Sequence, residues 1–532
     1  MGRYKGIRGQ YHSIQAAVDA AKPGDWILVG PGDYKTISSR APTAAEDSPA
    51  AVLITTPRLR LRGMNRNTVI VDGTKPGAGR CSASKSDQNF GPAGDGGAKG
   101  LNGVMVWKAT DVWVQNLTVC NFLSGSGDAG NGVWWNGGDG SGAVGGSSFN
   151  GSYLTATSTF FDTSDTSTAA AYGIFSSNWS GGTWSNAYAS NFDDSGFYIG
   201  ACQQVCDQTV DHVWAEYNAL GYSGSNSGGQ LVVKNSEFDN NEDGFDTNSQ
   251  NGDNPPPQNG ACPGNGISSI THTHSCWVFM DNYVHDNNNP NVPSAGLAAA
   301  GPVGTGISIS GGRNDTVMHN RFVHNGAWGT IFVPFPDSGP PCTGGTNAGA
   351  ACVYDEWGDA LIDNTYSGNG FFGNPTNGDF ALTNTEPGPT DCFSGNTDTS
   401  GALTATPSNA EQTYPSCNGN TVLPSDLNPQ SATFTEEVAC DSTLYLALVG
   451  KAPCSPSDHY PRLTTVAIHP LPSDLESMAR PCAGVPKNPW CSAKKHHRHR
   501  KHHHRRAHHR HHRKRHVRDP DHDGDVDNPA SG

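Results

Sequence analysis

Long apolar segments are missing from this sequence of 532 residues. Only 35% of the residues are hydrophobic, and no apolar run reaches the roughly 18 residues that a membrane-spanning helix needs. After residue 22 there is no apolar stripe of helical period and useful length. These absences exclude membrane-spanning helices and a large helical core. The 66 Gly residues, together with abundant Asn, Ser and Thr, instead favour short strands joined by tight turns.

Lys and Arg are scarce over most of the chain. Between residues 121 and 430 they occur only at Lys234, Arg313 and Arg321. Twelve of the 34 Lys and Arg residues, and 11 of the 21 His residues, lie within residues 494–518, so 22 basic residues face 49 acidic ones in the rest. An acidic body of this kind attracts anionic polymers poorly unless a metal ion bridges the like charges.

Paired CxxC units are also missing, although the chain has 14 Cys, and this excludes the common zinc-binding patterns. Most Cys have a second Cys nearby, which favours local disulfides and an oxidising compartment. The neighbouring pairs are Cys202/Cys206, Cys262/Cys276, Cys342/Cys352, Cys392/Cys417, Cys440/Cys454 and Cys482/Cys491. The first residues, "MGRYKGIRGQYHSIQ", lack the apolar run of a signal peptide. We therefore expect a leader upstream of residue 1 and an extracellular or cell-surface location.

A short repeat is the strongest signal in the sequence. It is seen in "NSEFDNN" (235–241), "DNYVHDNN" (281–288), "NRFVHNG" (320–326) and "NTYSGNG" (364–370). Each unit places an Asn before an aromatic residue and a second Asn shortly after it, and a short alternating strand precedes each unit. The units recur about every 20 to 27 residues, or at about twice that distance where Gly- and Pro-rich loops intervene. A period of this size predicts a solenoid.

The solenoid is expected to be a parallel β-helix. Leucine-rich repeats are excluded because the fixed apolar positions are Val, Ile, Phe and Tyr. In a parallel β-helix these side chains stack inside the coils, and Asn side chains at the corners bond to the coils above and below, about 4.8 Å away. The segment "YHSIQAAVDAAKPG" reads as an amphipathic helix that is capped by Ser13 and stopped at Pro23-Gly24, and we expect it to cover the open end of the solenoid.

This N-terminal stretch and "VLITTPRLRLRGMNRNTVIVDG" (52–73) resemble the first coils of the pectin-lyase-like superfamily. The resemblance implies an all-β protein, a right-handed parallel β-helix over residues 10–425 with an N-terminal capping helix. Proteins with this fold include lyases, hydrolases, epimerases and phage tailspikes. The fold alone therefore does not decide the activity.

The sequence after residue 425 is organised differently. Residues 426–493 are rich in Cys and Pro and are expected to form an irregular cap on the last coils. Residues 494–518 are a His-, Arg- and Lys-rich tail, expected to be disordered and to bind cell-wall or other polyanions. Residues 519–532 carry alternating acids that favour weak Ca²⁺ binding, at Asp519, Asp521, Asp523 and Asp525.

An acidic stretch, "NNEDGFDTNSQ" (240–250), is the first candidate site. It resembles the calcium-binding stretch of family nine pectate lyases, which implies Glu242, Asp243 and Asp246 as metal ligands. The same family uses a Lys to abstract the substrate proton about two coils later. The matching stretch here, "GTGISISGG" (304–312), has Ser308 at that position. The absence of this Lys argues against β-elimination.

A hydrolytic pair of acids is the second candidate. "NFDDSGFYIG" (191–200) repeats the design of the acidic stretch two coils earlier, which predicts Asp194 and Asp243 about 10 Å apart. Inverting glycosidases hold their two carboxyl groups about 6.5–9.5 Å apart. A third acidic stretch, "YDEWGDA" (354–360), is interpreted either as a further site or as a solvated corner.

Tryptophan side chains are candidates for stacking on sugar rings. Trp134, Trp135, Trp179 and Trp184 are expected either to form an exposed strip on neighbouring coils or to pack in the core or loops, and Trp357 lies within the third acidic stretch.

Together these features predict a monomeric extracellular protein without a membrane span that binds or processes polysaccharide, with Ca²⁺ as the expected cofactor. If the protein is an enzyme, it is a glycoside hydrolase or a polysaccharide lyase. The alternative is a non-catalytic structural or adhesive surface protein that is tethered by its basic tail.

Overall fold

The computed structural model describes residues 2–254, 256–293, 301–414, 422–423, 428–441 and 457–491. Residues Met1–Cys491 form one compact unit and Ser492–Gly532 a second one. The predicted basic tail and the four tail aspartates, Asp519 to Asp525, lie outside the described residues. No helix in the described ranges is long and apolar enough to cross a bilayer.

The N-terminal helix covers the start of the solenoid as predicted. The strands β1 (Arg3–Tyr4) and β2 (Ile7–Arg8) pair in a small hairpin, and α1 spans Ile14–Ala20. The Ser13 side chain accepts a hydrogen bond from the backbone N–H of Ala16, which satisfies a free donor of the first turn. Gln15 bonds to both backbone groups of Leu53 on the first coil, so the helix is fixed to the sheet edge that it covers.

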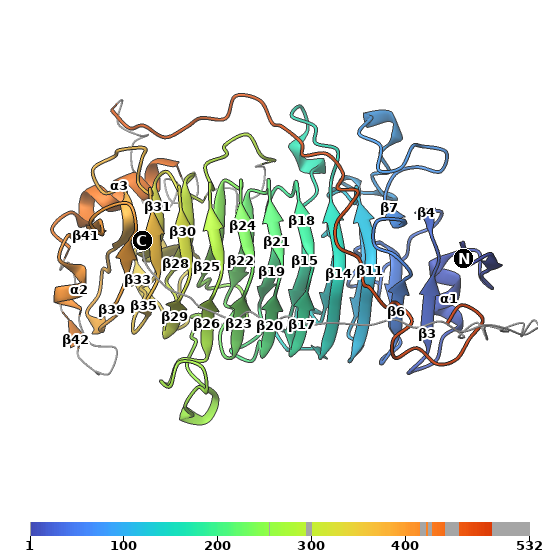
Figure 1. Cartoon of the computed structure of the whole chain (residues 1–532), viewed down its shortest axis with the longest axis horizontal. Coiled ribbons are helices and arrows are strands. Elements are labelled where there is room, and N and C mark those ends of the chain that lie inside the picture. The colour runs from blue at the N-terminus through green and yellow to red at the C-terminus, as the bar shows by residue number, and fades with distance from the viewer. Residues whose placement is uncertain are drawn as a thin grey trace, which may run out of the picture. The chain divides into compact units, whose positions relative to one another are not determined.

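The chain winds into stacked coils, each with three faces (Figure 1). The first and second faces are formed by β3 (Trp26–Val29) with β4 (Gly32–Lys35), β6 (Arg60–Gly63) with β7 (Val69–Asp72), the long strands β11 (Val112–Cys120) and β14 (Phe149–Thr157), β17 (Gly182–Ser185) with β18 (Tyr188–Ser190), β20 (Gln208–Asp211) with β21 (Trp214–Glu216), β23 (Leu231–Lys234) with β24 (Glu237–Asp239), β26 (Trp277–Met280) with β27 (Tyr283–His285), β29 (Asp315–Met318) with β30 (Arg321–Val323), β35 (Ala360–Ile362) with β36 (Thr365–Ser367) and β39 (Cys392–Ser394) with β40 (Thr397–Asp398).

The third face is an 11-stranded parallel sheet. Its strands are β5 (Ala50–Ile54), β10 (Asn102–Trp107), β12 (Val133–Asn136), β15 (Tyr172–Ser177), β19 (Ser195–Gly200), β22 (Leu220–Ser225), β25 (Asp243–Asn248), β28 (Thr305–Ser310), β31 (Trp328–Val333), β37 (Gly378–Leu382) and β41 (Ala405–Thr406). Strands of successive coils pair in parallel and in register, for example Tyr222 with Phe245 and Phe245 with Ile307. The protein is therefore an all-β, right-handed parallel β-helix, as the sequence predicts.

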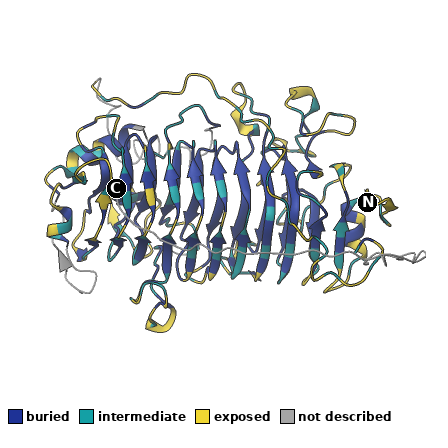
Figure 2. Cartoon of the chain, in the orientation of Figure 1, coloured by how far each residue is buried: buried dark blue, intermediate teal, exposed yellow. Residues whose placement is uncertain are grey.

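Short elements lie in the loops between these faces. They are β8 (Ala93–Gly94), β9 (Gly97–Ala98), β13 (Gly146–Ser147), β16 (Trp179–Ser180), β32 (Phe335–Ser338), β33 (Thr346–Ala348), β34 (Ala351–Tyr354), β38 (Gly388–Pro389), β42 (Val422–Leu423), α2 (Ala410–Thr413) and three 3₁₀ turns (Lys85–Asp87, Thr166–Thr168 and Pro263–Asn265). The strands are buried and the loops carry most of the exposed residues (Figure 2).

Asparagine ladders hold the corners of the coils together. Between the first and second faces, Asn320 Nδ2 donates to Asn364 Oδ1 at 3.0 Å, and Asn364 Nδ2 donates to Asn396 Oδ1 at 3.0 Å. A second ladder, between the second and third faces, includes Asn241 and Asn287. Because an amide carries both a donor and an acceptor, each step satisfies itself without charge. These contacts confirm the predicted role of the corner Asn residues.

Glycine beside the second ladder permits this close stacking. A Cβ at Gly244 would lie 2.5 Å from the carbonyl oxygen of Gly306 and 2.7 Å from Asn287 Nδ2. Equivalent glycines are Gly173, Gly196, Gly221, Gly306 and Gly329.

The C-terminal segment first packs on the last coils and then returns along the solenoid. Helix α3 (Ser431–Asp441) places Phe434 against Trp328 on β31. Residues 457–491 run back towards the N-terminus, where the ring of Trp490 contacts that of Tyr4 (Figure 1). This path differs from the expected cap on the last coils.

Corner residues of several coils hold this returning segment. Asn191 forms two hydrogen bonds with the backbone of His469, and Asn116 accepts bonds from Ser477 and Met478. The segment lacks a repeat of its own, so nothing in the sequence signals these docking points.

Disulfides close several loops, as the Cys spacing predicts. The bonds are Cys81–Cys120, Cys202–Cys206, Cys262–Cys276, Cys342–Cys352 and Cys482–Cys491. Cys392 and Cys440 also form disulfides, and their predicted partners, Cys417 and Cys454, lie outside the described residues. No free Cys occurs in the described part of the chain.

Candidate functional site

The candidate site lies on the outer face of the 11-stranded sheet, around β19, β22, β25 and β28. Side chains alternate along β25, so Phe245 stacks on Tyr222 inside the coil while Asp246 points outward. Asp246 is in register with Ser223 on one neighbouring strand and Ser308 on the other. Ser308 therefore occupies the outer face beside the acidic stretch, and no Lys does.

The carboxylates of β25 bond to hydroxyl and amide groups of their own and the next coil. Ser308 Oγ donates to Asp243 Oδ2 at 3.0 Å, and Ser310 Oγ donates to Asp246 Oδ1 at 3.0 Å. Asn248 Nδ2 donates to Asp246 Oδ2 at 2.8 Å. All of these partners are neutral, so they orient the two carboxylates without neutralising them.

Burial strongly raises the pKa values of the acids at this site. It raises the pKa of Asp194 to about 7, against hydrogen bonding by Tyr172 and Ser195. It raises the pKa of Asp246 to about 6, and the pKa of Asp243 well above its usual range with a further contribution from Asp246. Asp194 and Asp246 also repel each other. At neutral pH this carboxylate cluster, defined as Asp194, Asp243 and Asp246, therefore retains protons or needs a cation.

The scarce cations of the central coils lie elsewhere. Arg313 stacks on the Trp357 ring and Arg321 on the Tyr283 ring. Lys234 lies 4.0 Å from the Asp211 carboxylate on a different face. None of them lowers the pKa of an acid in the carboxylate cluster.

An aromatic row precedes the carboxylate cluster on the same outer face. Trp134 stacks on Phe175, with ring centroids 4.9 Å apart, and Phe175 packs edge-on against Tyr198. The Tyr172 ring contacts both Phe175 and Tyr198. These rings belong to an apolar cluster that is separate from the interior core, and they continue a row that begins at Leu53 and Met105. Sequence reasoning identified only Trp134, because Tyr172 and Tyr198 lie outside the repeat motif.

Loops cover much of this surface. Asp243 is 0% exposed, and a Cβ on Gly301 would lie 3.2 Å from its Oδ2. Trp134 is 3% exposed. Tyr172, Asp194 and Asp246 remain partly exposed and mark where solvent reaches the site.

The exposed tryptophan strip does not form, because Trp134 is 3% exposed on the outer face and the other three lie inside the coils. Trp135, Trp179 and Trp184 are each 0% exposed and belong to the interior core. Trp135 and Trp184 both contact the Phe149 ring inside the coils. The sequence does not show whether an aromatic side chain on a short strand points into the coil or outward, because the alternation of inward and outward positions is broken at every corner. Trp357 is partly exposed but carries Arg313 on its ring, far along the chain from the aromatic row.

The predicted metal ligands are brought together only in part. Asp243 and Asp246 share the outer face, whereas Glu242 immediately precedes β25. Glu242, Asp243 and Asp246 do not bring three ligand atoms within 4.8 Å of one another; among the described residues two other groups do.

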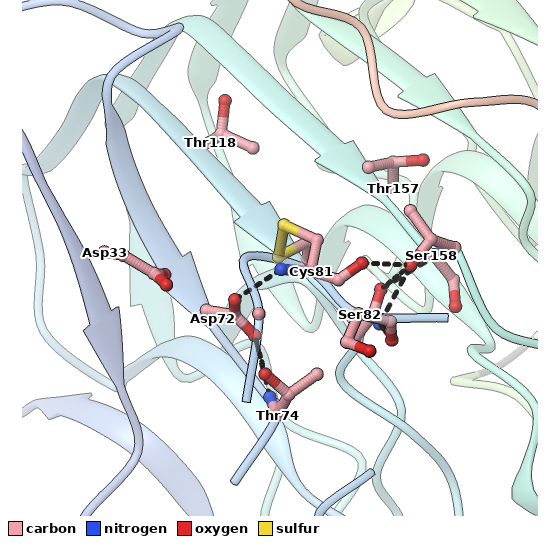
Figure 3. Close-up of a disulfide and its surroundings, with 12 residues drawn as sticks. Asp33, Asp72, Thr74, Cys81, Ser82, Thr118, Thr157 and Ser158 are labelled. Atoms are coloured by element: carbon pink, nitrogen blue, oxygen red, sulfur yellow. Dashed lines mark hydrogen bonds between the residues drawn. A yellow bond between two sulfur atoms is a disulfide. The ribbon is translucent and has the colours of Figure 1, made fainter. Parts of the chain in front are cut away.

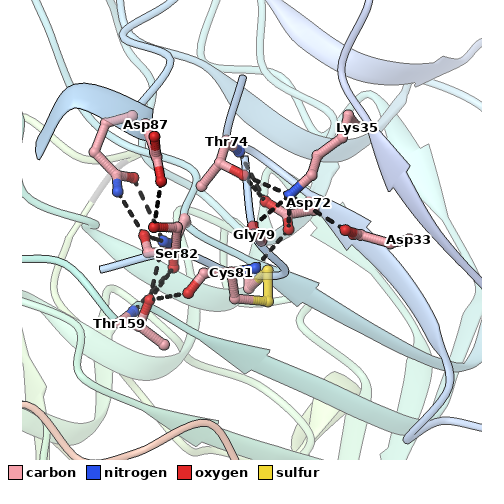
Figure 4. A network of polar contacts seen from close by, with 12 residues as sticks. Asp33, Lys35, Asp72, Thr74, Gly79, Cys81, Ser82, Asp87 and Thr159 are labelled. Carbon is pink, nitrogen blue, oxygen red and sulfur yellow. Dashed lines mark hydrogen bonds and ion pairs between the residues drawn. A yellow bond between two sulfur atoms is a disulfide. The ribbon is translucent and has the colours of Figure 1, made fainter. Parts of the chain in front are cut away.

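One of those groups is not a metal site. It consists of Asp72, Cys81 and Cys120, and the two Cys form a disulfide (Figure 3). Asp72 Oδ2 instead accepts bonds from Lys35 Nζ at 2.5 Å and from the Cys81 backbone at 2.6 Å (Figure 4). This network fixes the long loop after β7 to the second coil. The other group, Glu237, Asp239 and His285, lies on the second face.

The third acidic stretch is not a solvated corner. Asp355, Glu356 and Asp359 are at most 1% exposed. Asp315 N–H donates to Asp359 Oδ1 at 2.7 Å, and Asp359 N–H donates to Asp391 Oδ1 at 2.9 Å. Asp315, Asp359 and Asp391 therefore form a carboxylate ladder at the start of the first face, in the manner of the asparagine ladders.

Two cavities, of about 460 and 290 Å³, lie at the N-terminal end of the solenoid. The larger one is lined by Trp26 and by residues 485–490 of the returning segment.

Comparisons with known proteins find solved structures that are distantly similar to this chain. The chain is similar to the A-module of a mannuronan C-5 epimerase of Azotobacter vinelandii, with 14% identity and a TM-score of 0.45 over 74% of this chain and 90% of that chain. It is also similar to a pectate lyase (13%, TM-score 0.36, 74% and 72%) and to a mannuronic acid specific polysaccharide lyase from human gut microbiota (11%, TM-score 0.38, 74% and 81%). At these identities the likeness concerns the fold alone. No protein-family model matches the chain, and no curated protein sequence matches it.

Proposed function

We propose that the outer face at Tyr172, Asp194 and Asp246 binds an extracellular polysaccharide and cleaves it by hydrolysis. The observation that carries the proposal is the pairing of two partly exposed acids of raised pKa with an aromatic row on one face. Aromatic rings stack on sugar rings, and two carboxyl groups supply the acid and the base of glycoside hydrolysis. The disulfides support action in an oxidising, extracellular environment.

Asp194 is assigned as the general acid. With a pKa of about 7, a large share of its carboxyl groups carries a proton at neutral pH. That proton passes to the glycosidic oxygen as the bond to the anomeric carbon breaks. Asp246, with a pKa of about 6, is mostly ionised and takes a proton from the water that attacks the anomeric carbon. Asp243 is enclosed, so it positions its neighbours through Ser308 and does not touch the sugar.

Hydrolysis is favoured over elimination by the lack of a strong base. The position opposite Asp246 is Ser308, whose hydroxyl already donates to Asp243. Burial raises the pKa of Tyr172 and Tyr198 well above the usual range, so neither phenol ionises readily at neutral pH.

Calcium fits the donor set of β25 and β28. Asp243 and Asp246 supply carboxylate oxygens, while Asn248 Oδ1 and Thr305 Oγ1 are buried oxygens that accept no hydrogen bond. Ca²⁺ prefers such all-oxygen surroundings. When bound it would neutralise the cluster and any carboxylate of a uronate substrate.

The test is a screen of neutral and uronate polysaccharides for cleavage, with Ca²⁺ and with chelator. Hydrolysis releases reducing ends without an unsaturated sugar, whereas elimination adds the ultraviolet absorbance of the new double bond. Asp194→Asn and Asp246→Asn should each lower the rate about 100-fold or more. Asp363→Asn is the control, because its side chain is 59% exposed and lies at a distant corner. Full activity of Asp194→Asn, or an unsaturated product, would contradict the assignment.

The alternative is a non-catalytic surface protein. This alternative is favoured because loops cover both Asp243 and the aromatic row, which leaves little of either exposed to a substrate. In that case the wild type would retain polysaccharide on an affinity gel but release no new ends, and Asp194→Asn would bind as tightly as the wild type.

A further inference from the structure

A second group of metal-binding side chains lies on the second face of the coils, away from the carboxylate cluster. Glu216, Asp239 and His285 occupy one register position on the consecutive strands β21, β24 and β27. Glu237, Asp239 and His285 each offer a ligand atom, and these atoms lie within 4.8 Å of one another. We propose that Glu237, Asp239 and His285 bind a divalent transition-metal ion, with Zn²⁺ as the best match.

The orientation of His285 carries the argument. Its Nδ1 lies 2.8 Å from Asp286 Oδ2, and the tautomer with its proton on Nδ1 donates to that carboxylate. In the neutral ring Nε2 then carries a lone pair, and it lies 3.1 Å from Glu237 Oε1. Two such acceptor atoms repel each other unless a proton or a cation lies between them. A carboxylate behind a metal-binding His is the usual second partner of such sites.

The spacing also suits a tetrahedral ion. Bonds of about 2.0 Å place neighbouring ligand atoms about 3.3 Å apart, close to the observed 3.1 Å between Nε2 and Oε1. Asp239 is held for this purpose, because its Oδ1 accepts a hydrogen bond from Trp214 Nε1 at 2.7 Å. The Tyr283 ring stacks on the His285 ring, with centroids 3.9 Å apart, and fixes its plane.

The donor set selects the class of metal. One imidazole nitrogen and two carboxylates suit Zn²⁺ and its neighbours better than Ca²⁺, which prefers oxygen alone. Three protein ligands leave a fourth position, which faces solvent because the Glu237 side chain is 45% exposed.

The returning C-terminal segment borders the same site. The His469 ring stacks on Tyr217, with centroids 4.4 Å apart, and its Nε2 lies 3.5 Å from Glu216 Oε1. His469 also interacts electrostatically with Asp239. The site therefore lies between the coils and the segment that ties both ends of the solenoid together.

The experiment measures how Zn²⁺ changes the urea midpoint of the full chain at about pH 7.5. Any Zn²⁺ bound by the His-rich tail would leave the midpoint unchanged, because a ligand that binds folded and unfolded chains equally adds no stability. Zn²⁺ at 100 times its dissociation constant should raise the folding equilibrium constant about 100-fold through the proposed site. Co²⁺ should also raise the urea midpoint, whereas Ca²⁺ should not raise it by binding at His285.

Matched variants identify the residues. His285→Gln and Glu237→Gln should each abolish the rise of the midpoint, and Glu237→Gln keeps the test open if the first variant fails to fold. His212→Asn is the control, since its 62% exposed ring pairs only with Asp211. A midpoint unmoved by Zn²⁺ in the wild type would show that a proton alone joins His285 to Glu237, and an unchanged rise in His285→Gln would place the ion elsewhere. Either result overturns the proposal.

Discussion

Replacing Asp359 by Asn tests the physical origin of the carboxylate ladder. In the neighbouring asparagine ladder, Nδ2 of each residue donates to Oδ1 of the next, at 3.0 Å between Asn364 and Asn396. In the carboxylate ladder, Asp359 Oδ2 and Asp315 Oδ1 are buried and accept no hydrogen bond. Burial and repulsion by Asp315 and Asp391 raise the pKa of Asp359 well above its usual value of 3.8. The Asn side chain supplies the missing donor without needing a proton.

The size of the effect follows from linkage. A carboxyl group whose folded-state pKa lies above its unfolded-state pKa binds its proton more tightly in the folded chain. Its contribution to stability is then full below about pH 3.8 and falls as the pH rises towards the folded-state pKa. Over the pH range in which Asp359 keeps its proton only in the folded protein, the cost grows by about 1.4 kcal/mol per pH unit above 3.8, so it is larger at pH 7.5 than at pH 4.5. Asp391, with a pKa of about 7, follows the same course within its own range.

Urea unfolding in chelator at the two pH values measures this difference. Asp359→Asn should stabilise the protein clearly at pH 7.5 and by about 1 kcal/mol or less at pH 4.5. Asn364→Asp is the control of opposite sign, because it removes the donors to Asn396 Oδ1 and to the Val317 carbonyl. It should destabilise the protein at pH 7.5 and much less at pH 4.5. An equal shift of Asp359→Asn at both pH values, or destabilisation at pH 7.5, would refute the reasoning.

Two further predictions concern the fold. Gly244→Ala should lower the free energy of unfolding by about 1–3 kcal/mol or more, because its Cβ would lie 2.5 Å from the Gly306 carbonyl oxygen. The control Gly252→Ala, whose Cβ would have no atom within 4 Å, should change the free energy of unfolding by less than about 0.5 kcal/mol. Urea midpoints compare the two variants, and equal midpoints would contradict the stacking argument. Titration of free thiols in denatured, unreduced protein should find few or none of the 14 Cys reactive, and many free thiols would speak for an intracellular protein.

The fold was predictable because polar side chains, mostly Asn, recur at the corners of successive coils. In "NRFVHNG" and "NTYSGNG" the aromatic residue two places after the first Asn points inward, as Phe322 and Tyr366 do. In "NSEFDNN" Ser236 holds the corner position, and Phe238 points inward two places after it. In "DNYVHDNN" that inward position is Val284, and Tyr283 faces outward beside His285. The Asn ladder sets the register, since its side chains bond from coil to coil, whereas the aromatic position varies with what fills the core.

The covering of the candidate site was not predictable in the same way. Asp243 is enclosed by Gly301, which follows a long insertion, and the C-terminal segment reaches Asn191 and Asn116 from the far end of the chain. Such contacts are made by segments that do not repeat along the chain, so no pattern in the sequence predicts them. The same holds for Trp179 and Trp184, because insertions and corners interrupt the alternation that would assign them to the core.

The contrast between amide and carboxylate corners accounts for where this protein needs protons or cations. An Asn at a corner donates and accepts, so a stack of Asn residues is complete in itself. An Asp at an equivalent corner only accepts, so Asp315, Asp359 and Asp391 have raised pKa values, and Asp315 Oδ1 and Asp359 Oδ2 accept no hydrogen bond. Asp243 and Asp246 repeat the situation on the outer sheet, where neutral hydroxyl groups orient them without compensating their charge. Sequence reasoning allowed a solvated corner at the third acidic stretch, which includes Asp359, because exposure is the usual state of Asp. Stacking removes that exposure, and it makes each buried acid a point at which pH or a bound cation controls stability or chemistry.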